Sequence, residues 1–150
     1  MGTCIGAVVG LVAITPGAGF VTVAQSIFIG LAASVISNIA VHLRTKSSLD
    51  DTLDVFPCHG VGGMTGMIFT GIFAALPADG SVTRTQLLIV HGKALVLVSV
   101  FAFVVSYILF KVTDLIIPLR VSEEQEAEGL DMSQHGEIAL SADAFGGVVA

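Results

Sequence analysis

Long apolar segments alternate with short polar ones along this chain. Residues 1–43 and 55–78 contain no Asp, Glu, Lys or Arg, and residues 87–110 contain only Lys93. One straight helix over the first segment would be about 65 Å long, roughly twice the ~30 Å hydrocarbon core of a bilayer. We therefore expect this segment to fold back at residues 15–19 (TPGAG), because proline lacks a backbone N–H and glycine permits turn dihedrals.

The pattern predicts four membrane-spanning segments, at about residues 2–14, 21–43, 55–76 and 87–110. All four should be helices, because an isolated strand leaves its backbone unsatisfied in lipid. The first has 14 residues before Thr15, against the ~20 needed to cross, so it either uses part of the Pro16 turn or begins before residue 1. The predicted fold class is an all-α polytopic membrane protein, with a helical bundle over residues 1–118 and a tail over 119–150.

Composition supports a membrane protein with an acidic tail. Hydrophobic residues make up 54% of the chain and charged residues 12%, about half the usual share of a soluble domain. The formal net charge of -6 and the lack of a basic patch exclude nucleic-acid binding. We expect no secretory leader, because no basic segment precedes the first apolar one. Residues 112–150 carry one basic side chain, Arg120, against eight acidic ones.

The basic residues predict the orientation, since they gather at the cytoplasmic ends of membrane spans. If residues 44–54 and the C-terminus are cytoplasmic, four basic residues lie inside and two outside: Arg44, Lys46, Lys111 and Arg120 against Arg84 and Lys93. With four spans, the N-terminal end then also faces the cytoplasm.

Glycines recur at every fourth position on two of the spans. Gly2, Gly6 and Gly10 do so on the first, and Gly62 and Gly66 on the third. Close backbone approach through small faces is a main source of packing energy between helices in lipid. We expect these two helices to contact others, although ordinary glycine usage in membrane helices is an equal alternative for any single pair.

A histidine inside the third span is the main candidate for function. A titratable side chain is costly in a membrane helix, which makes His59 a functional hypothesis by default. Gly62, Gly63, Gly66 and Thr70 follow it at helical spacing, so one face should carry an imidazole beside a glycine track that lines a narrow path. The alternative is a histidine that hydrogen-bonds to a neighbouring helix as a structural contact.

The remaining polar groups of the membrane part are given structural roles. Asp54 should be the N-cap of the third span, because a carboxylate there accepts free amide hydrogens and complements the helix dipole. Cys4 and Cys58 lack the spacing of a disulfide framework or zinc site, so we interpret both as small core residues. The sequence contains no catalytic triad, metal cluster or phosphate-binding loop, so we predict neither an enzyme nor a cofactor.

The acidic tail contains a helix signature. Ser122 and Gln125 have capping-box spacing, and Gly129 is a suitable C-terminal stop, which predicts a short helix at about residues 123–128. The alternative is a solvated acidic run without a partner.

Three blocks then carry a resemblance to a known family: GLVAITPGAGFV (10–21), DDTLDVFPCHGVGGMTGMIFTGIFAA (50–75) and LRVSEEQEAEGLDMSQHGE (119–137). Their order and spacing closely resemble the C-terminal third of the ammonium transporter family (Amt/Mep/Rh), from about residue 2 to residue 140. The DVF-x-x-HG-x-GG segment is highly specific. Pro57 and Cys58 stand where many relatives have other small residues.

The resemblance implies a fold and an assembly. Members are typically homotrimers in the cell membrane, and each protomer has eleven transmembrane helices around its own hydrophobic pore and a cytoplasmic C-terminal tail. The four predicted spans resemble helices eight to eleven, which gives the same orientation as the basic residues. The expected surroundings are therefore the lipid bilayer, the remaining helices of the transporter and the homotrimer neighbours.

The resemblance also implies a function. His59 resembles the second of two pore histidines whose rings touch midway through the pore; the other three, His42, His91 and His135, do not fit the partner's position. The family captures ammonium, deprotonates it and passes ammonia through an apolar channel. Its outer aromatic cage and phenylalanine gate would lie upstream, in agreement with the absence of Trp.

In the family the tail packs on the neighbouring protomer and transmits regulation. This implies a regulatory role for the segment with Gly129 and Ser133, where Ser133 aligns with a threonine that is phosphorylated in some plant relatives. Ammonium transport is the predicted function. The alternatives are an ammonium sensor or regulatory subunit that reports to a signalling protein of the PII type, and a Rh-like gas channel.

Overall fold

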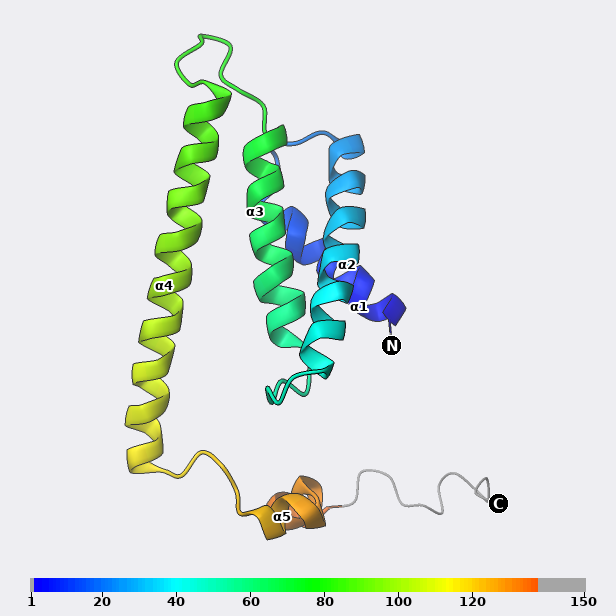
Figure 1. Ribbon diagram of the computed structural model, residues 1–150, viewed down its shortest axis with the longest axis vertical. Coiled ribbons are helices and arrows are strands. Elements are labelled where there is room, and N and C mark those ends of the chain that lie inside the picture. The colour runs from blue at the N-terminus through cyan, green and yellow to red at the C-terminus, as the bar shows by residue number, and fades with distance from the viewer. Residues whose placement is uncertain (1, 138–150) are drawn as a thin grey trace, which may run out of the picture. The chain divides into compact units, whose positions relative to one another are not determined.

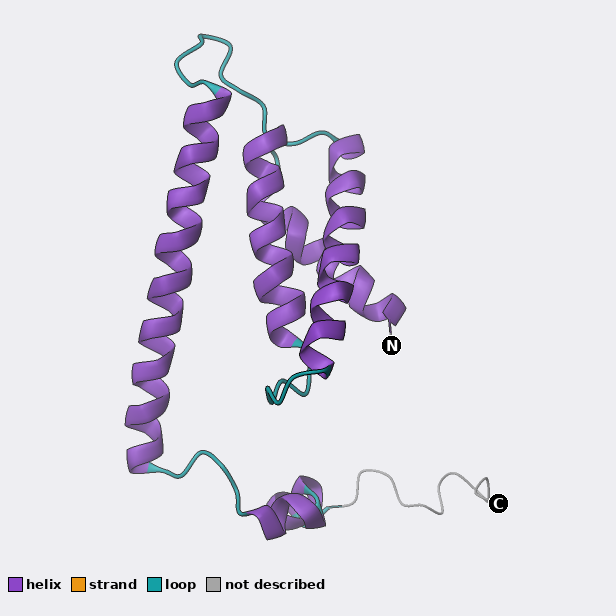
Figure 2. Cartoon of the chain, viewed as in Figure 1, coloured by secondary structure: helices purple, strands orange, loops and turns teal. Residues whose placement is uncertain are grey.

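The computed structural model describes residues 2–137, and every regular element in that part of the chain is a helix (Figures 1 and 2). The elements are α1 (Gly2–Ile14), the 3-10 turn η1 (Thr15–Gly17), α2 (Val23–Thr45), the π turn η2 (Phe56–Val61), α3 (Gly62–Phe73), α4 (Arg84–Ile116), α5 (Glu123–Glu128) and the π turn η3 (Asp131–His135). The chain divides into two compact units, residues 1–101 and 102–150. The part of the expected tail beyond residue 137 lies outside the described residues.

The predicted fold-back after the first helix is confirmed. α1 has the expected bounds, and Pro16 lies in the first turn of η1, where a missing N–H costs nothing. The apolar helix continues through this turn to Gly17 and so includes Pro16. Gly19 then reverses the chain with a φ of +83°, a conformation that glycine adopts without strain.

Capping boxes set where α2 and α4 begin. The Thr22 amide donates to Gln25 Oε1 (2.8 Å) and the Gln25 amide donates to Thr22 Oγ1 (3.4 Å), so α2 starts at Val23 rather than at residue 21. Thr83 and Gln86 make the same pair of bonds, at 2.8 and 3.3 Å, before α4. Each pair satisfies amide hydrogens that have no partner within the helix.

Two helices of the described chain are long and apolar enough to cross a membrane, α2 and α4. α4 has 33 residues and is about 50 Å long, so it extends beyond the expected residues 87–110 at both ends. The third predicted span, residues 55–76, is helical as far as Phe73 and consists of the π turn η2 followed by the 12-residue helix α3.

Glycines bring α1 and α2 into close contact, as their spacing predicts (Figure 1). A Cβ built at Gly30 would lie 3.7 Å from the Cα of Gly10, so the two backbones cross at these glycines. Beside the crossing, Ser34 Oγ donates to the carbonyl oxygens of Gly6 (3.1 Å) and Gly30 (2.8 Å). Such small faces allow dispersion contacts and hydrogen bonds that larger side chains would prevent.

The approach of α3 to α1 is closer still. A Cβ at Gly66 would lie only 2.1 Å from the Ala13 carbonyl oxygen, and one at Gly62 would lie 3.3 Å from Val9 Cγ1. Around these contacts lies the core, which consists of buried side chains from α1, α2 and η2: Val9, Ala13, Ile29, Ala33 and Cys58. Glycine on α3 therefore positions the helix that carries His59.

Hydrogen bonds join the loops at one end of the arrangement formed by α1, α2 and α3. The Ala75 amide donates to the Phe20 carbonyl (2.9 Å), so the loops before α2 and after α3 lie at one end. At that end, Arg84 donates from Nη1 to the carbonyls of Ala74 (2.7 Å) and Gly71 (3.2 Å). A cation at the carbonyl end of α3 also complements the helix dipole. The loop between α2 and η2 lies at the opposite end.

The second unit contains the short helix that the sequence predicts. α5 covers Glu123–Glu128, with Ser122 and Gln125 as its capping box and Gly129, at a φ of +102°, after its last turn. An exposed ion pair joins Arg120 Nη2 to Glu126 Oε1 (2.9 Å). The predicted tail helix and its stop at Gly129 are confirmed.

Candidate functional site

His59 lies in η2, and its side chain is exposed although Pro57 and Cys58 beside it are buried. Five side chains are exposed between Val55 and Phe73, and His59 is the only polar one among them, the others being Val55, Phe56, Ile68 and Ile72. Within the described part of the chain, no hydrogen bond to the imidazole is found. The imidazole is therefore an exposed polar group in a segment whose other exposed side chains are apolar.

The expected glycine track beside His59 is only partly open. Gly62, Gly66 and Thr70 are buried, and Gly66 faces Ala13 rather than an open path. Gly63 is half-buried, and the nearest atom to a Cβ there would be Val12 Cγ1 at 3.9 Å. The expectation that all four residues line a path with His59 is wrong for the three buried ones.

The π turn is the physical reason for this difference. An i→i+5 turn holds more residues than an α-helical turn, so residues before and after it do not keep the α-helical register. In a regular helix, His59 and Gly66 would share a face, because they are seven residues apart. Here η2 intervenes, and His59 is exposed while Gly66 is buried.

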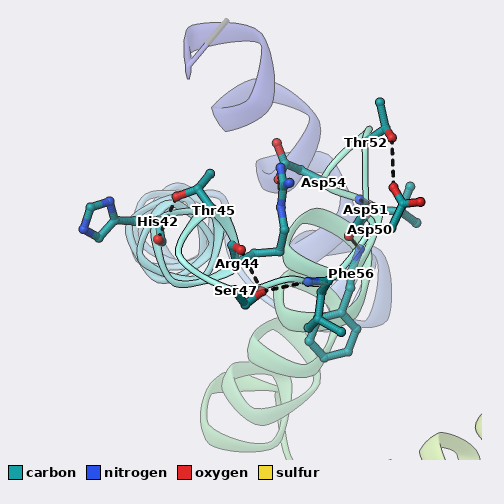
Figure 3. Close-up of polar contacts among 11 residues, drawn as sticks. His42, Arg44, Thr45, Ser47, Asp50, Asp51, Thr52, Asp54 and Phe56 are labelled. Carbon is teal, nitrogen blue, oxygen red and sulfur yellow. Dashed lines mark hydrogen bonds and ion pairs between the residues drawn. The ribbon is translucent and has the colours of Figure 1, made fainter. Parts of the chain in front are cut away.

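Asp51, not Asp54, caps the helix that carries His59. The carboxylate of Asp51 accepts hydrogen bonds from the amides of Val55 (2.8 Å) and Phe56 (2.9 Å). Asp54 has a φ of +53°, and its carboxylate accepts hydrogen bonds from Arg44 Nε (3.0 Å) and Nη2 in a half-buried ion pair (Figure 3). The prediction that Asp54 is the N-cap is wrong, because this backbone conformation directs its side chain to α2.

Two further polar groups lie behind the helix, on the side that faces α1 and α2. Ser37 Oγ donates a 2.7 Å hydrogen bond to the Pro57 carbonyl, and both residues are fully buried. Thr70 is 3% exposed, and its hydroxyl has no hydrogen-bond partner among the described residues; it lies 3.0 Å from the position of a Cβ at Gly17. Glycine at position 17 thus leaves space for this hydroxyl.

The cysteines differ in burial. Cys58 is buried in the core, as expected, but Cys4 is exposed, because it lies away from the face of α1 that carries Val9 and Ala13. Both are free thiols. No group of three or more His, Cys, Asp or Glu side chains that could hold a metal ion is found among residues 2–137.

The candidate regulatory residues lie together in the second unit. Ser133, in η3, donates from Oγ to the Gln125 carbonyl of α5 (3.2 Å) and is half-buried. Gly129 connects the two elements. The hydroxyl of Ser133 therefore joins η3 to α5, and a phosphate on it would replace this donor with two negative charges beside an acidic helix.

Sequence reasoning missed Ser37, Asp51 and Arg84. Asp51 had a signal, since an acidic residue precedes the apolar segment, but two other aspartates lie within three residues of it. The partners of Ser37 and Arg84 are backbone carbonyls 20, 13 and 10 residues away, which no local pattern identifies.

An imidazole in these surroundings can accept and donate a hydrogen bond in its neutral form, and it can take up a proton. The other exposed side chains of this segment are apolar and offer no competing hydrogen bond. The site can therefore contact a small polar molecule, hold a proton or pair with a polar group of another helix.

Comparison with known proteins identifies the family of the chain. The Ammonium Transporter Family profile matches residues 1–140. The chain is 41% identical over 145 residues to ammonium transporter Amt1 of Archaeoglobus fulgidus, which covers 94% of this chain and 37% of that protein. It is 43% identical over 148 residues to an ammonium transporter of Bacillus subtilis, which covers 93% of this chain and 36% of that protein.

Similarity extends to a eukaryote, with 33% identity over 154 residues to ammonium transporter MEP3 of Saccharomyces cerevisiae, covering 93% of this chain and 31% of that protein. The chain thus spans about a third of the length of these curated relatives. A match over nearly the whole chain, in archaeal, bacterial and yeast proteins alike, means that the chain belongs to the ammonium transporter family.

Proposed function

We propose that this chain forms part of a pathway that conducts ammonium or ammonia across the cell membrane. The observation that carries the proposal is the exposed imidazole of His59, in a segment (residues 55–73) whose other exposed side chains are apolar. In a bilayer such a group has no water to bond to, so it must face a pathway or a polar group of another helix. The family and the names of the relatives favour ammonium as the substrate.

The chemistry of imidazole fits this substrate. An ammonium ion is far more costly in an apolar channel than neutral ammonia is. A neutral His59 can accept a hydrogen bond from either species and can take up a proton. We propose that His59 holds or transfers the proton while ammonia crosses the apolar section. Gly63 is half-buried, and a Cβ there would lie no closer than 3.9 Å to an atom of another helix, so this glycine leaves space on the helix that carries His59.

The proposed arrangement in the membrane has four spans. They are α1 with η1, α2, η2 with α3, and α4, and they correspond to helices eight to eleven of an eleven-helix protomer. The membrane domain covers residues 1–118 and the tail residues 119–150. The alternation of loops at the two ends of α3 and the excess of basic residues at one end support a cytoplasmic C-terminus.

The proposed assembly is a homotrimer of complete protomers that takes part in nitrogen uptake. The acidic tail, with Gly129 and Ser133 at the junction of α5 and η3, is the proposed regulatory segment. Its partners would be the neighbouring protomer and a signalling protein of the PII type. The contact of Ser133 with Gln125 supports a modification-sensitive tail, since a phosphate would break it.

Ammonium uptake by a chimeric transporter tests the proposal. The chain replaces the matching segment of the Bacillus subtilis relative, and the chimera is expressed in cells that lack ammonium transport. Uptake and electrical current are measured together. We expect the His59→Gln chimera to assemble normally but to take up ammonium about tenfold more slowly, or to carry a different charge per ammonium. The reason is that an amide cannot take up a proton near neutral pH.

His42→Gln is the matched control, since His42 is exposed in the last turn of α2. It should leave uptake and current at the values of the unmodified chimera. If His59→Gln also kept both values, His59 would be a structural contact and the proposed role in transport would be wrong.

A further inference from the structure

The turn that carries His59 is the least regular part of its helix. η2 makes i→i+5 hydrogen bonds over Phe56–Val61, and α-helical geometry begins at Gly62. In an uninterrupted α-helix, His59 would face the same side as Gly66, which is packed on Ala13. The exposed position of the imidazole therefore depends on the π turn.

A side chain from a different helix holds this turn in place. Ser37 of α2 is fully buried, and its Oγ donates to the Pro57 carbonyl at 2.7 Å, the most common distance for a hydroxyl donor. Pro57 is also fully buried, and it precedes His59 by two residues. Because this site is buried, water cannot replace the Ser37 hydroxyl as a hydrogen-bond donor to the Pro57 carbonyl if the hydroxyl is removed.

Packing fixes the position of Ser37. The buried residues of α2 are Ile29, Ala33 and Ser37, which are spaced four apart and so lie on one face. On α3, a Cβ at Gly62 would lie 3.5 Å from Ser37 Oγ, so glycine at this position lets the Ser37 hydroxyl approach the backbone of α3. The hydroxyl thus reaches the turn from a helix that the core already holds.

We propose that Ser37 is a positioning residue for His59, a role that rests on the proposed function of His59 in transport. Its hydroxyl binds the Pro57 carbonyl and stabilises the π turn, which keeps the imidazole on the exposed side. Without the hydroxyl, α-helical hydrogen bonding is favoured at this turn, and His59 rotates towards the side of Gly66. Ser37 acts through the backbone and makes no hydrogen bond to the imidazole.

Thiol labelling measures this rotation directly. The chimera carries Cys4→Ala and Cys58→Ala, which remove the native thiols of this chain, with the host's own cysteines also replaced, and His59→Cys, which reports the direction of the side chain. The probe is a maleimide, and the labelling rate is measured with and without Ser37→Ala. We expect Ser37→Ala to slow labelling by about fivefold, the change in population that one neutral hydrogen bond typically produces.

Control variants separate rotation from general loss of structure. Ser26→Ala removes a hydroxyl that bonds within α2, to the Val23 carbonyl at 2.7 Å, and should not change the rate. Ile68→Cys places a thiol at a position 49% exposed beyond the π turn, and Ser37→Ala should not change its labelling. Ser37→Thr keeps the hydroxyl and should keep the rate at His59→Cys.

The outcomes are distinct. Unchanged labelling of His59→Cys in the Ser37→Ala protein would overturn the proposal. An equal decrease at His59→Cys and Ile68→Cys would also overturn it, because the helix would then have lost its packing rather than rotated. In the chimera with native His59, Ser37→Ala should change the charge carried per ammonium in the same direction as His59→Gln. Labelling does not depend on transport, so a failure of the proposed transport role would leave the labelling result standing.

Discussion

At Gly66 the backbones of α3 and α1 are too close for any other residue. An added Cβ would lie 2.1 Å from the Ala13 carbonyl oxygen and 2.7 Å from the carbonyl carbon. We expect Gly66→Ala to destabilise the assembled chimera by about 3 kcal/mol or more, because the obstacle is backbone and overpacking costs most where nothing can shift. The yield of assembled protein in detergent and its thermal unfolding measure this.

Gly63→Ala is the control, with the nearest atom at 3.9 Å from the added Cβ. It should keep the yield and the melting temperature of the parent, since methyl contacts at that distance are ordinary. Equal losses in both variants would contradict the contact with Ala13 as the cause, because alanine has the higher helix propensity and should not by itself destabilise either position.

The residues of the site illustrate what a sequence can identify. The presence of His59 in an apolar segment was sufficient to single it out, because an ionisable group in a membrane is costly wherever it points. Its direction could not be predicted, since the π turn depends on Ser37, 22 residues earlier in the chain. Likewise, Asp51 rather than Asp54 is the cap because Asp54 has a positive φ and forms an ion pair with Arg44 of α2. A local sequence pattern does not reveal either feature.

At the scale of elements, the helix ends were predictable where the signal is local. The pattern Ser/Thr-x-x-Gln precedes three helices, at Thr22, Thr83 and Ser122. In each case the two residues exchange hydrogen bonds between the side chain of one and the main-chain amide of the other. The third pattern predicts the start of α5, whereas hydropathy alone predicts starts at residues 21 and 87 for α2 and α4, which begin at Val23 and Arg84. Hydropathy alone places a span but does not place its first residue.

The tail helix provides a test at this scale. α5 has six residues and no buried side chain, so local contacts must hold it. Ser122→Ala removes the hydroxyl that accepts from the Gln125 amide, at a cost of about 1 kcal/mol. We expect amide exchange at Gln125 and Glu126 to become about fivefold faster, as measured by hydrogen–deuterium exchange of the chimera.

Glu128→Gln is suitable as the comparison, because it changes the last residue of α5 without touching the cap. Its exchange rates should match those of the parent. If Ser122→Ala exchanged no faster than Glu128→Gln, then the Arg120–Glu126 ion pair and the contact between Ser133 and Gln125 would be sufficient to hold the helix.

For the whole molecule, the structure modifies the count of basic residues on which the orientation depends. Arg84 is half-buried and donates to the carbonyls of Gly71 and Ala74, so it serves α3 rather than the loop. Arg44 is paired with Asp54, but Lys46 in the same loop is exposed. With Arg84, Arg44 and Arg120 all engaged in such contacts, Lys46 and Lys111 remain on the proposed inner side and Lys93 on the outer side, which leaves the predicted asymmetry at two to one.

The two loops at opposite ends of α3 should therefore lie on opposite sides of the membrane. Ser48 and Ser81 are exposed in these loops, and cysteine is close to serine in size. In a cysteine-free chimera in intact cells, we expect a membrane-impermeant maleimide to label Ser81→Cys at once and Ser48→Cys only after the cells are opened. The reverse result would invert the orientation. Labelling of both variants from outside would mean that η2 and α3 do not cross the membrane, because a crossing helix must separate its two loops.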